Sequence, residues 1–228
     1  PYVDNRPLAP ELNFSIGETL DYRVTAAGQN AGTITTSARE RKLIGGQDSL
    51  VLTAIVTSVD PSMRLLTLGD HVQVLADPET LEPRSVESRF NSTLKGLTQT
   101  ITLDPRSGAV TVPGLPPVDG PVGTHTLLSL LYAMRSFNLA PSLDRTNPIN
   151  DTRVAVFWED RTYVFTLRPS KAEDITIDGR KYPAQLVAIT TGNQQLDALQ
   201  PKVWLSTGPG REPLRITAGA LQADLIRR

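Results

Sequence analysis

Apolar and polar residues alternate along most of the chain with a period of two, the pattern of strands with one buried face. Leu20, Tyr22 and Val24, for example, alternate with polar neighbours, and two-residue turns such as Asp178-Gly179 separate these segments. The sequence therefore predicts many short antiparallel strands.

About a dozen segments follow this rule, at the spacing of roughly 8–12 residues that is typical of sandwiches and barrels. They are residues 20–25, 33–40, 49–59, 64–75, 84–90, 97–103, 154–158, 163–167, 175–177, 182–188, 202–206, 213–218 and 221–226. No regular alternation of strands and helices occurs, so a parallel sheet is not expected.

One segment, residues 127–139, has helical periodicity instead. Leu127, Leu130, Leu131, Met134 and Phe137 fall on one arc of a helical projection, and further apolar residues extend that arc past the half-circle. The opposite face carries only small or weakly polar residues, whereas a solvent-facing helix would carry Glu and Lys. We therefore expect a helix over residues 124–140, enclosed by the sheet.

The preferred fold is mostly β: a strongly curved antiparallel sheet or open barrel of about a dozen strands, wrapped around one central apolar helix. Residues 1–13 read as an N-terminal leader or linker, and residues 14–228 as a single β-rich domain. The alternative is two halves, residues 14–112 and 151–228, joined by the helix.

Composition excludes some classes of function. The 228 residues include 23 basic and 24 acidic side chains, so no electrostatic footprint for nucleic acid exists. The absence of cysteine excludes disulfides, thiolate metal sites and cysteine nucleophiles. No apolar run reaches the ~20 residues of a transmembrane helix. Because the chain starts at Pro1, we expect a processed N-terminus from which a signal peptide or lipid-bearing cysteine was removed.

Residues that could carry chemistry are few. His71 and His125 are the only histidines, and no Gly-x-Ser-x-Gly elbow accompanies them, so no catalytic residue is assigned. Asp77, Glu79 and Glu82 form a carboxylate cluster between two prolines, which indicates an exposed turn. Residues 144–151 offer oxygen ligands without regular calcium-site spacing, so neither a metal nor a cofactor is expected.

Four side chains are candidate ligand-binding residues. Tyr132 and Arg135 lie at the edge of the helix's apolar arc, where Arg135 either pairs with a carboxylate or meets an anionic ligand. Trp158 and Trp204 lie on expected strands, and both suit the core or the rim of a site.

Landmarks along the chain resemble those of a family of exported bacterial proteins, domain of unknown function 3108. The opening strand Phe14–Tyr22 (FSIGETLDY) is similar to the family's, and Gly32 suits the small residue on its next strand. Residues 77–83 resemble its mid-chain turn, residues 128–135 (LSLLYAMR) its helix, and residues 204–206 with 213–216 its closing hairpin. One departure is Thr126-Leu127, where the family often has an acidic residue.

This resemblance, over residues 14–226, implies a β-rich fold and export to the periplasm or cell envelope; it supplies no reaction and no catalytic residues. At fold level the family is similar to periplasmic lipoprotein carriers, in which a curved sheet encloses a helix and an apolar groove. That likeness is an analogy, which bears on fold more than on function.

Three functions are therefore weighed. The first is a non-enzymatic envelope protein that binds an apolar ligand or lipid in its curved sheet. The second is a binding or scaffold module for an envelope polymer or a protein partner. The third, which no residue pattern favours, is a hydrolase acting through His71, His125 or the carboxylates Asp77, Glu79 and Glu82. A cavity between helix and sheet would favour the first.

Overall fold

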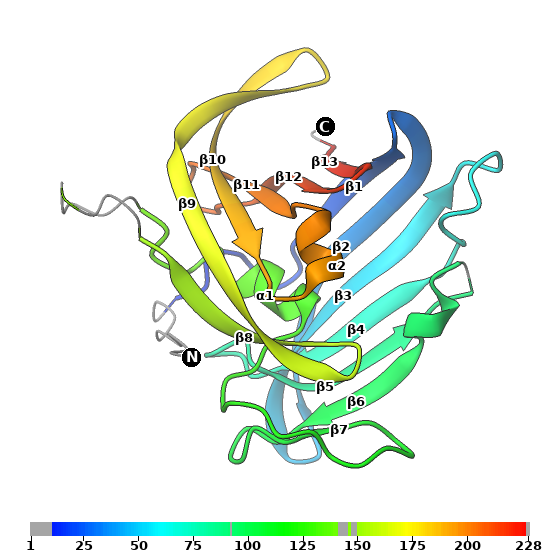
Figure 1. Ribbon diagram of the computed structural model, residues 1–228, viewed down its shortest axis with the longest axis vertical. Coiled ribbons are helices and arrows are strands. Elements are labelled where there is room, and N and C mark those ends of the chain that lie inside the picture. The colour runs from blue at the N-terminus through cyan, green and yellow to red at the C-terminus, as the bar shows by residue number, and fades with distance from the viewer. Residues whose placement is uncertain (1–10, 92, 141–145, 147–149, 227–228) are drawn as a thin grey trace.

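The computed structural model describes residues 11–226 except 92, 141–145 and 147–149, and it consists mainly of β-strands (Figure 1). The first half of the chain forms β1 (Thr19–Ala26), β2 (Gln29–Ile44), β3 (Gln47–Val59), β4 (His71–Ala76), β5 (Pro83–Arg89), β6 (Gln99–Leu103) and β7 (Val110–Thr111). The second half forms β8 (Thr152–Trp158), β9 (Arg161–Ile177), β10 (Arg180–Thr190), β11 (Lys202–Ser206), β12 (Pro213–Ala218) and β13 (Leu221–Leu225).

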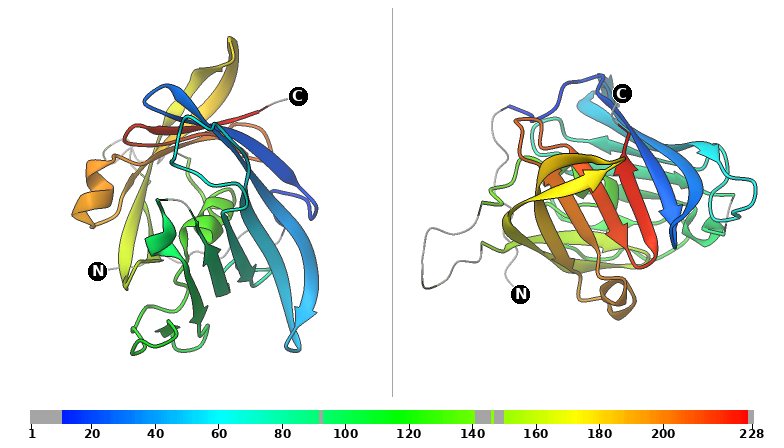
Figure 2. Two further views of the ribbon diagram at one scale, coloured as in Figure 1. Left: turned by 90° about the vertical axis from the view of Figure 1, so that its right-hand side faces the viewer. Right: turned by 90° about the horizontal axis from the view of Figure 1, so that it is seen from above.

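All thirteen strands join one antiparallel sheet, in the order β7-β6-β5-β4-β3-β2-β1-β13-β12-β11-β10-β9-β8. Nearly every strand therefore pairs with its neighbours in sequence. The exception is the pair β1 and β13, which come from the two ends of the chain. In this pair Tyr22 lies opposite Leu225. The expected curved antiparallel sheet is confirmed, and it curls into a nearly closed barrel (Figure 2).

The connection between β7 and β8 helps to close the barrel. Val118 forms a bridge with Val110 of the edge strand β7, and His125 forms a parallel bridge with Val156 of the other edge strand, β8. Gly108 makes this closure possible, because a Cβ at that position would lie 2.1 Å from the carbonyl oxygen of Gly120. Its φ of +75° also favours glycine.

The expected long central helix is not what the structure contains. Helix α1 spans only Leu127–Ala133, and the chain continues through turns at residues 134–136. The apolar residues beyond Ala133 are still buried, among them Met134, Phe137 and Leu139. The apolar pattern thus indicated the burial of these residues correctly. Beyond Met134, however, tertiary contacts bury Phe137 and Leu139 without continuing the helix, so the prediction of a helix to Leu139 was wrong.

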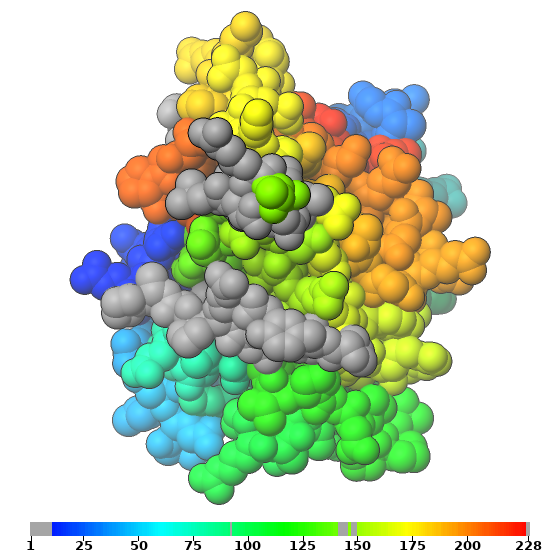
Figure 3. Space-filling model, turned by 60° about the vertical axis from the view of Figure 1, so that its left-hand side comes forward, coloured from blue at the N-terminus to red at the C-terminus, as the bar shows by residue number. Residues whose placement is uncertain are grey.

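Helix α1 contacts β3, β4 and β8, and Leu128, Leu130 and Ala133 belong to the main hydrophobic core. Figure 1 shows α1 within the curve of the sheet. A second, smaller cluster includes Tyr22 and Leu225 together with residues near the tip of the β9–β10 hairpin. That hairpin projects at the top of Figure 3.

Three short elements were not expected, and the two-residue strand β7 is one of them. Helix α2 (Gln194–Ala198) connects β10 to β11. Its N-terminus is capped by the Asn193 side chain, which accepts hydrogen bonds from the backbone N–H groups of Gln195 and Leu196. A 3₁₀ turn, η1 (Lys95–Leu97), precedes β6. In addition, the strand expected over residues 64–75 begins only at His71, because residues 60–70 form a loop.

Because successive strands are antiparallel, their connections alternate between the two ends of the barrel. The loop of residues 60–70, η1, the β8–β9 turn and α2 therefore meet at one end, which we call the open end. The β2–β3, β4–β5, β9–β10 and β11–β12 turns lie at the other, which we call the closed end. Within the residues that the structure describes, no helix is long and apolar enough to span a membrane.

Candidate functional site

A cavity of about 510 Å³ lies between α1 and the concave face of the sheet. Helix α1 and the turn after it form one wall, with Leu127, Leu128, Leu130, Leu131 and Met134. Leu127 is 44% exposed although it belongs to the most apolar helix of the chain. One side of α1 therefore faces space, whereas its other residues complete the core.

The opposite wall is made by inward-facing residues of the sheet. Ile34, Ala54, Val72, Ile189 and Ile216 come from five strands, and all five line the cavity. Each is only half-buried, although its strand neighbours in the core are fully buried. Leaving apolar surface in contact with water costs about 25 cal/mol per Å² relative to burial. The cavity is therefore suited to an apolar occupant.

Polar groups in this lining are sparse and mostly uncharged: Thr36, Ser88, Gln99, Thr126, Thr191 and Thr217. Among the described residues that line the cavity, only Glu159 and Lys202 carry charge. Glu159 lies in the β8–β9 turn and Lys202 begins β11 just after α2, so both belong to the open end. The charges are thus confined to the mouth.

The closed end is occupied by the Arg135 side chain, which is 1% exposed. Its guanidinium donates to both carboxylate oxygens of Glu18, at 2.6 and 3.0 Å, and its Nε donates to the carbonyl oxygen of Gly210 at 2.9 Å. The rings of Phe14 and Tyr132 lie 5.0 and 5.8 Å from the guanidinium carbon. Arg135 thus takes the carboxylate-paired alternative and ties three segments together.

The four candidate ligand residues are consequently separated. Only Trp158 lines the cavity, and neither Tyr132 nor Arg135 does. Trp204 donates its indole N–H to Glu173 at 2.7 Å and packs against the smaller cluster. A role for these four in binding stays a prediction, for which Trp158 has the most suitable position.

Tyr132 has one further property. Burial raises the pKa of its phenol to about 12, and the nearby Thr36 hydroxyl opposes this rise only in part. The phenol oxygen makes no hydrogen bond of normal geometry with a described residue. Among the described residues it is therefore a buried polar atom whose hydrogen-bonding capacity is at best weakly satisfied.

His125 and Ser129 lie within hydrogen-bond distance, with 3.1 Å between Nδ1 and Oγ. Both are buried, and the Ser129 hydroxyl also accepts from the backbone N–H of Thr126 at 2.9 Å, as part of the cap of α1. Burial lowers the pKa of His125 to about 4, so the imidazole is neutral near pH 7. The pair serves to join α1 to β8, and no carboxylate orients the histidine.

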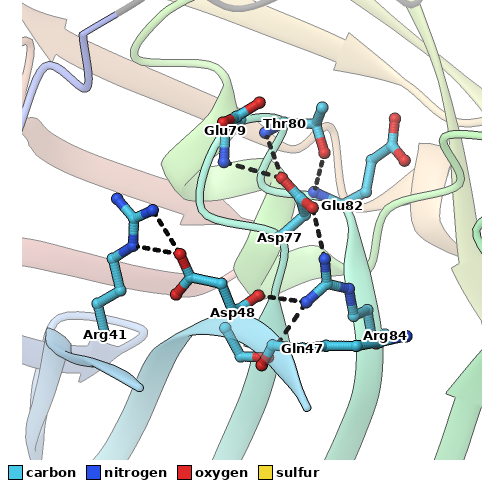
Figure 4. A network of polar contacts seen from close by, with 9 residues as sticks. Arg41, Gln47, Asp48, Asp77, Glu79, Thr80, Glu82 and Arg84 are labelled. Carbon is cyan, nitrogen blue, oxygen red and sulfur yellow. Dashed lines mark hydrogen bonds and ion pairs between the residues drawn. The ribbon is translucent and has the colours of Figure 1, made fainter. Parts of the chain in front are cut away.

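His71 and the carboxylate cluster lie apart from the cavity. His71 Nδ1 lies 2.9 Å from the carbonyl oxygen of Gly69. In the β4–β5 turn, Asp77 accepts hydrogen bonds from two backbone N–H groups and pairs with Arg84 at 2.6 Å (Figure 4). Burial, aided by the charge of Asp77, raises the pKa of Glu82. These carboxylates organise a turn at the closed end.

Two further places in the molecule are less suited to an apolar ligand. The oxygen-rich segment 144–151 falls mostly outside the described residues, and Asp151 pairs with Arg168 at 2.7 Å. A hollow of about 700 Å³ lies on the surface between the loop of residues 60–68 and Asn91, Thr93 and Lys95. Its lining mixes apolar and charged side chains, so it favours an apolar ligand less than the cavity does.

Sequence reasoning did not identify Glu159 and Lys202, or the inward-facing residues of the sheet, as parts of a site. Strand alternation did indicate which residues face inward. The alternation could not indicate that the space between these residues and α1 is unfilled, because this depends on how far α1 lies from each strand.

Comparison with known proteins gives a family but no function. The family model described as "Protein of unknown function (DUF3108)" matches residues 21–224. No curated protein matches the chain. A crystal structure of a beta-barrel-like protein of domain of unknown function DUF1849 from Brucella abortus is 11% identical, covers 92% of this chain and 95% of its own, and has a TM-score of 0.43. The family match spans most of the chain, and the protein therefore belongs to the DUF3108 family.

Proposed function

We propose that the protein is a non-enzymatic binding protein of the periplasm or cell envelope, which holds an apolar ligand such as a lipid acyl chain inside its barrel. The observation that carries this proposal is the cavity of about 510 Å³ between α1 and the sheet. Its volume falls in the range of roughly 300–1,000 Å³ that is typical of small-molecule sites.

The chemistry of the walls supports a lipid-like ligand. Leu127 and Leu131 on one side and Ile34, Ile189 and Ile216 on the other are apolar, lie at the cavity and are not fully buried. A packed core would bury such residues completely. A long apolar chain placed between them would remove their surface from water, and that gain would drive binding.

The arrangement of polar groups supports binding over catalysis. Ser129 and His125, the one Ser–His pair among the described residues, are buried in the cap of α1 and are absent from the cavity lining. The carboxylates of the β4–β5 turn lie at the opposite end of the barrel from the mouth. A hydrolase would need a nucleophile and a base that a bound substrate can reach.

The proposal is tested by native mass spectrometry of the purified protein after incubation with a lipid extract, together with displacement of a fluorescent fatty probe. We expect a bound acyl species and saturable probe binding. Ala54→Phe, which places a ring in the cavity, should weaken probe binding at least tenfold. Ile55→Phe, on the exposed face of the same strand, is the matched control and should bind as the wild type does.

Failure of both measurements, with no acyl species and no probe binding by the folded protein, would overturn the proposal. Equal probe binding by Ala54→Phe and Ile55→Phe would place the ligand elsewhere. The location in the envelope rests on the family resemblance, and fractionation of cells that express the natural full-length protein tests it.

A further inference from the structure

We infer that the ligand is a single-chain zwitterionic amphiphile, whose chain occupies the cavity while its anionic group meets Lys202 and its ammonium group meets Glu159. This inference rests on the proposed function and adds the class of ligand and its orientation. It follows from where charge occurs in the cavity lining, from the volume, and from the aromatic residue beside Glu159.

Charge in the lining is limited to the mouth. Glu159, in the β8–β9 turn, and Lys202, the first residue of β11, are opposite in sign, and they form no ion pair with each other or with any other described residue. By contrast, the neighbouring Asp160 pairs with Arg161 at 3.2 Å. A ligand with one positive and one negative group matches this unpaired couple, whereas a singly charged headgroup would meet one attractive and one repulsive side chain.

The interior decides the orientation. Beyond Glu159 and Lys202 the lining contains only apolar and uncharged polar side chains. Moving a charged headgroup past them would remove it from water without a partner, which is strongly unfavourable. The headgroup must therefore stay at the mouth, and the apolar chain must enter first.

The volume indicates one chain. At roughly 30 Å³ for each water-sized group, a cavity of about 510 Å³ holds about 17 such groups. One long acyl chain has that many methylene and methyl groups, and two chains would need twice the space.

The β8–β9 turn supports an ammonium subsite. Glu159 has a φ of +57°, a left-handed conformation that Gly or Asn usually fills in two-residue hairpins. The side chain before it, Trp158, is half-buried and lines the cavity. A carboxylate next to an indole is a favourable environment for an ammonium or quaternary ammonium group, because cation–π attraction adds to the ion pair.

The experiment compares four probes with one palmitoyl or hexadecyl chain each: lysophosphatidylcholine, palmitate, hexadecyltrimethylammonium and monopalmitoylglycerol. Each displaces a fluorescent fatty probe below its own micelle concentration. We expect the zwitterion to bind at least tenfold more tightly than the others. Lys202→Gln and Glu159→Gln should each remove most of that preference, and each should weaken binding of the zwitterion more than binding of the uncharged monopalmitoylglycerol.

Two exposed residues at the closed end supply matched controls, because Lys181→Gln and Glu79→Gln also remove one charge each. Both should keep the preference for the zwitterion, and circular dichroism confirms folding of every variant. Equal binding of all four probes would overturn this inference while leaving the proposed function intact. Tighter binding of palmitate than of the zwitterion would also overturn it, and the absence of any binding would overturn both.

Discussion

The two ends of the barrel differ in how completely their interiors are filled. At the closed end, Arg135 is 1% exposed and its guanidinium is surrounded by a carboxylate, carbonyl oxygens and two rings. Toward the open end, Leu127 and Leu131 of the preceding helix α1 are not fully buried and face a cavity. One short segment thus joins a packed interior to an unfilled one.

This difference indicates which interactions hold the fold and which are left for a ligand. Contacts at the closed end link the N-terminal segment, α1 and the β11–β12 turn, so they stabilise the barrel without any ligand. Apolar residues that face the cavity are only partly buried. They therefore contribute less to the free energy of unfolding than fully buried residues of the same type would. Substitutions at the closed end should therefore destabilise the protein more than substitutions at the cavity.

Replacing Arg135 by Met should destabilise the protein most. The change leaves the Glu18 carboxylate, which is only 18% exposed, without its partner. Breaking a buried pair on one side costs about 3–5 kcal/mol in the free energy of unfolding, which urea titration measures. Probe binding by the folded fraction should persist, because Arg135 does not line the cavity. A change no larger than that of Arg168→Met, in an exposed pair, would contradict the role of this end.

Acid should weaken the junction between α1 and β8. The pKa of His125 is about 4 in the folded protein, whereas the ordinary value of 6.5 applies in the unfolded chain. As pH falls, the unfolded chain takes up the proton first, so stability is complete above pH 6.5 and is lost between pH 6.5 and 4. The loss amounts to about 3 kcal/mol.

Urea unfolding at pH 7 and pH 4.5 measures this dependence in the wild type and in His125→Gln. The variant should lose the part of the pH dependence that occurs above pH 4.5. His71→Gln, which keeps His125, should retain it. The same acid sensitivity in His125→Gln and the wild type would exclude His125 as its source.

Replacing a leucine by alanine should lower the free energy of unfolding more in the packed core than at the cavity. Leu139 is 1% exposed and belongs to the main core, so Leu139→Ala should cost about 2–5 kcal/mol. Leu131 faces the cavity and is half-buried, so Leu131→Ala should cost about 1 kcal/mol, since it removes fewer contacts. Chemical denaturation of both variants without ligand tests this. Equal losses would indicate that the cavity side is as well packed as the closed end.

The smallest expected effects come from two buried tyrosines. Tyr22 donates its hydroxyl to the carbonyl oxygen of Pro213 at 2.8 Å, so Tyr22→Phe should cost about 1 kcal/mol. The Tyr132 hydroxyl has no partner of normal geometry, so Tyr132→Phe should leave the free energy of unfolding unchanged or raise it slightly. Thermal unfolding distinguishes the two. A larger loss for Tyr132→Phe would show that its hydroxyl is satisfied in solution.

Local patterns predicted the strands well because a period of two and a turn sequence are properties of neighbouring residues. The turn at Asp178-Gly179 separates β9 from β10, as expected, and a turn at Glu159-Asp160 lies between the segments 154–158 and 163–167 that were expected as strands. The end of the helix was predicted poorly because burial of Phe137 and Leu139 gives the same apolar pattern with or without helical hydrogen bonds. Short α2 was missed because its five residues make too little periodicity to recognise.

The sequence by itself determined that the chain is mostly β, that its strands are antiparallel, and that most apolar side chains of residues 127–139 are buried. These properties follow from the side chains of adjacent residues. Only the tertiary structure decided that Arg135 forms an ion pair with Glu18. It also decided that Trp158 lines the cavity while Trp204 does not, and that Glu159 and Lys202 both line its mouth. Such facts depend on distances between segments far apart in the chain, which the curvature of a thirteen-stranded sheet sets.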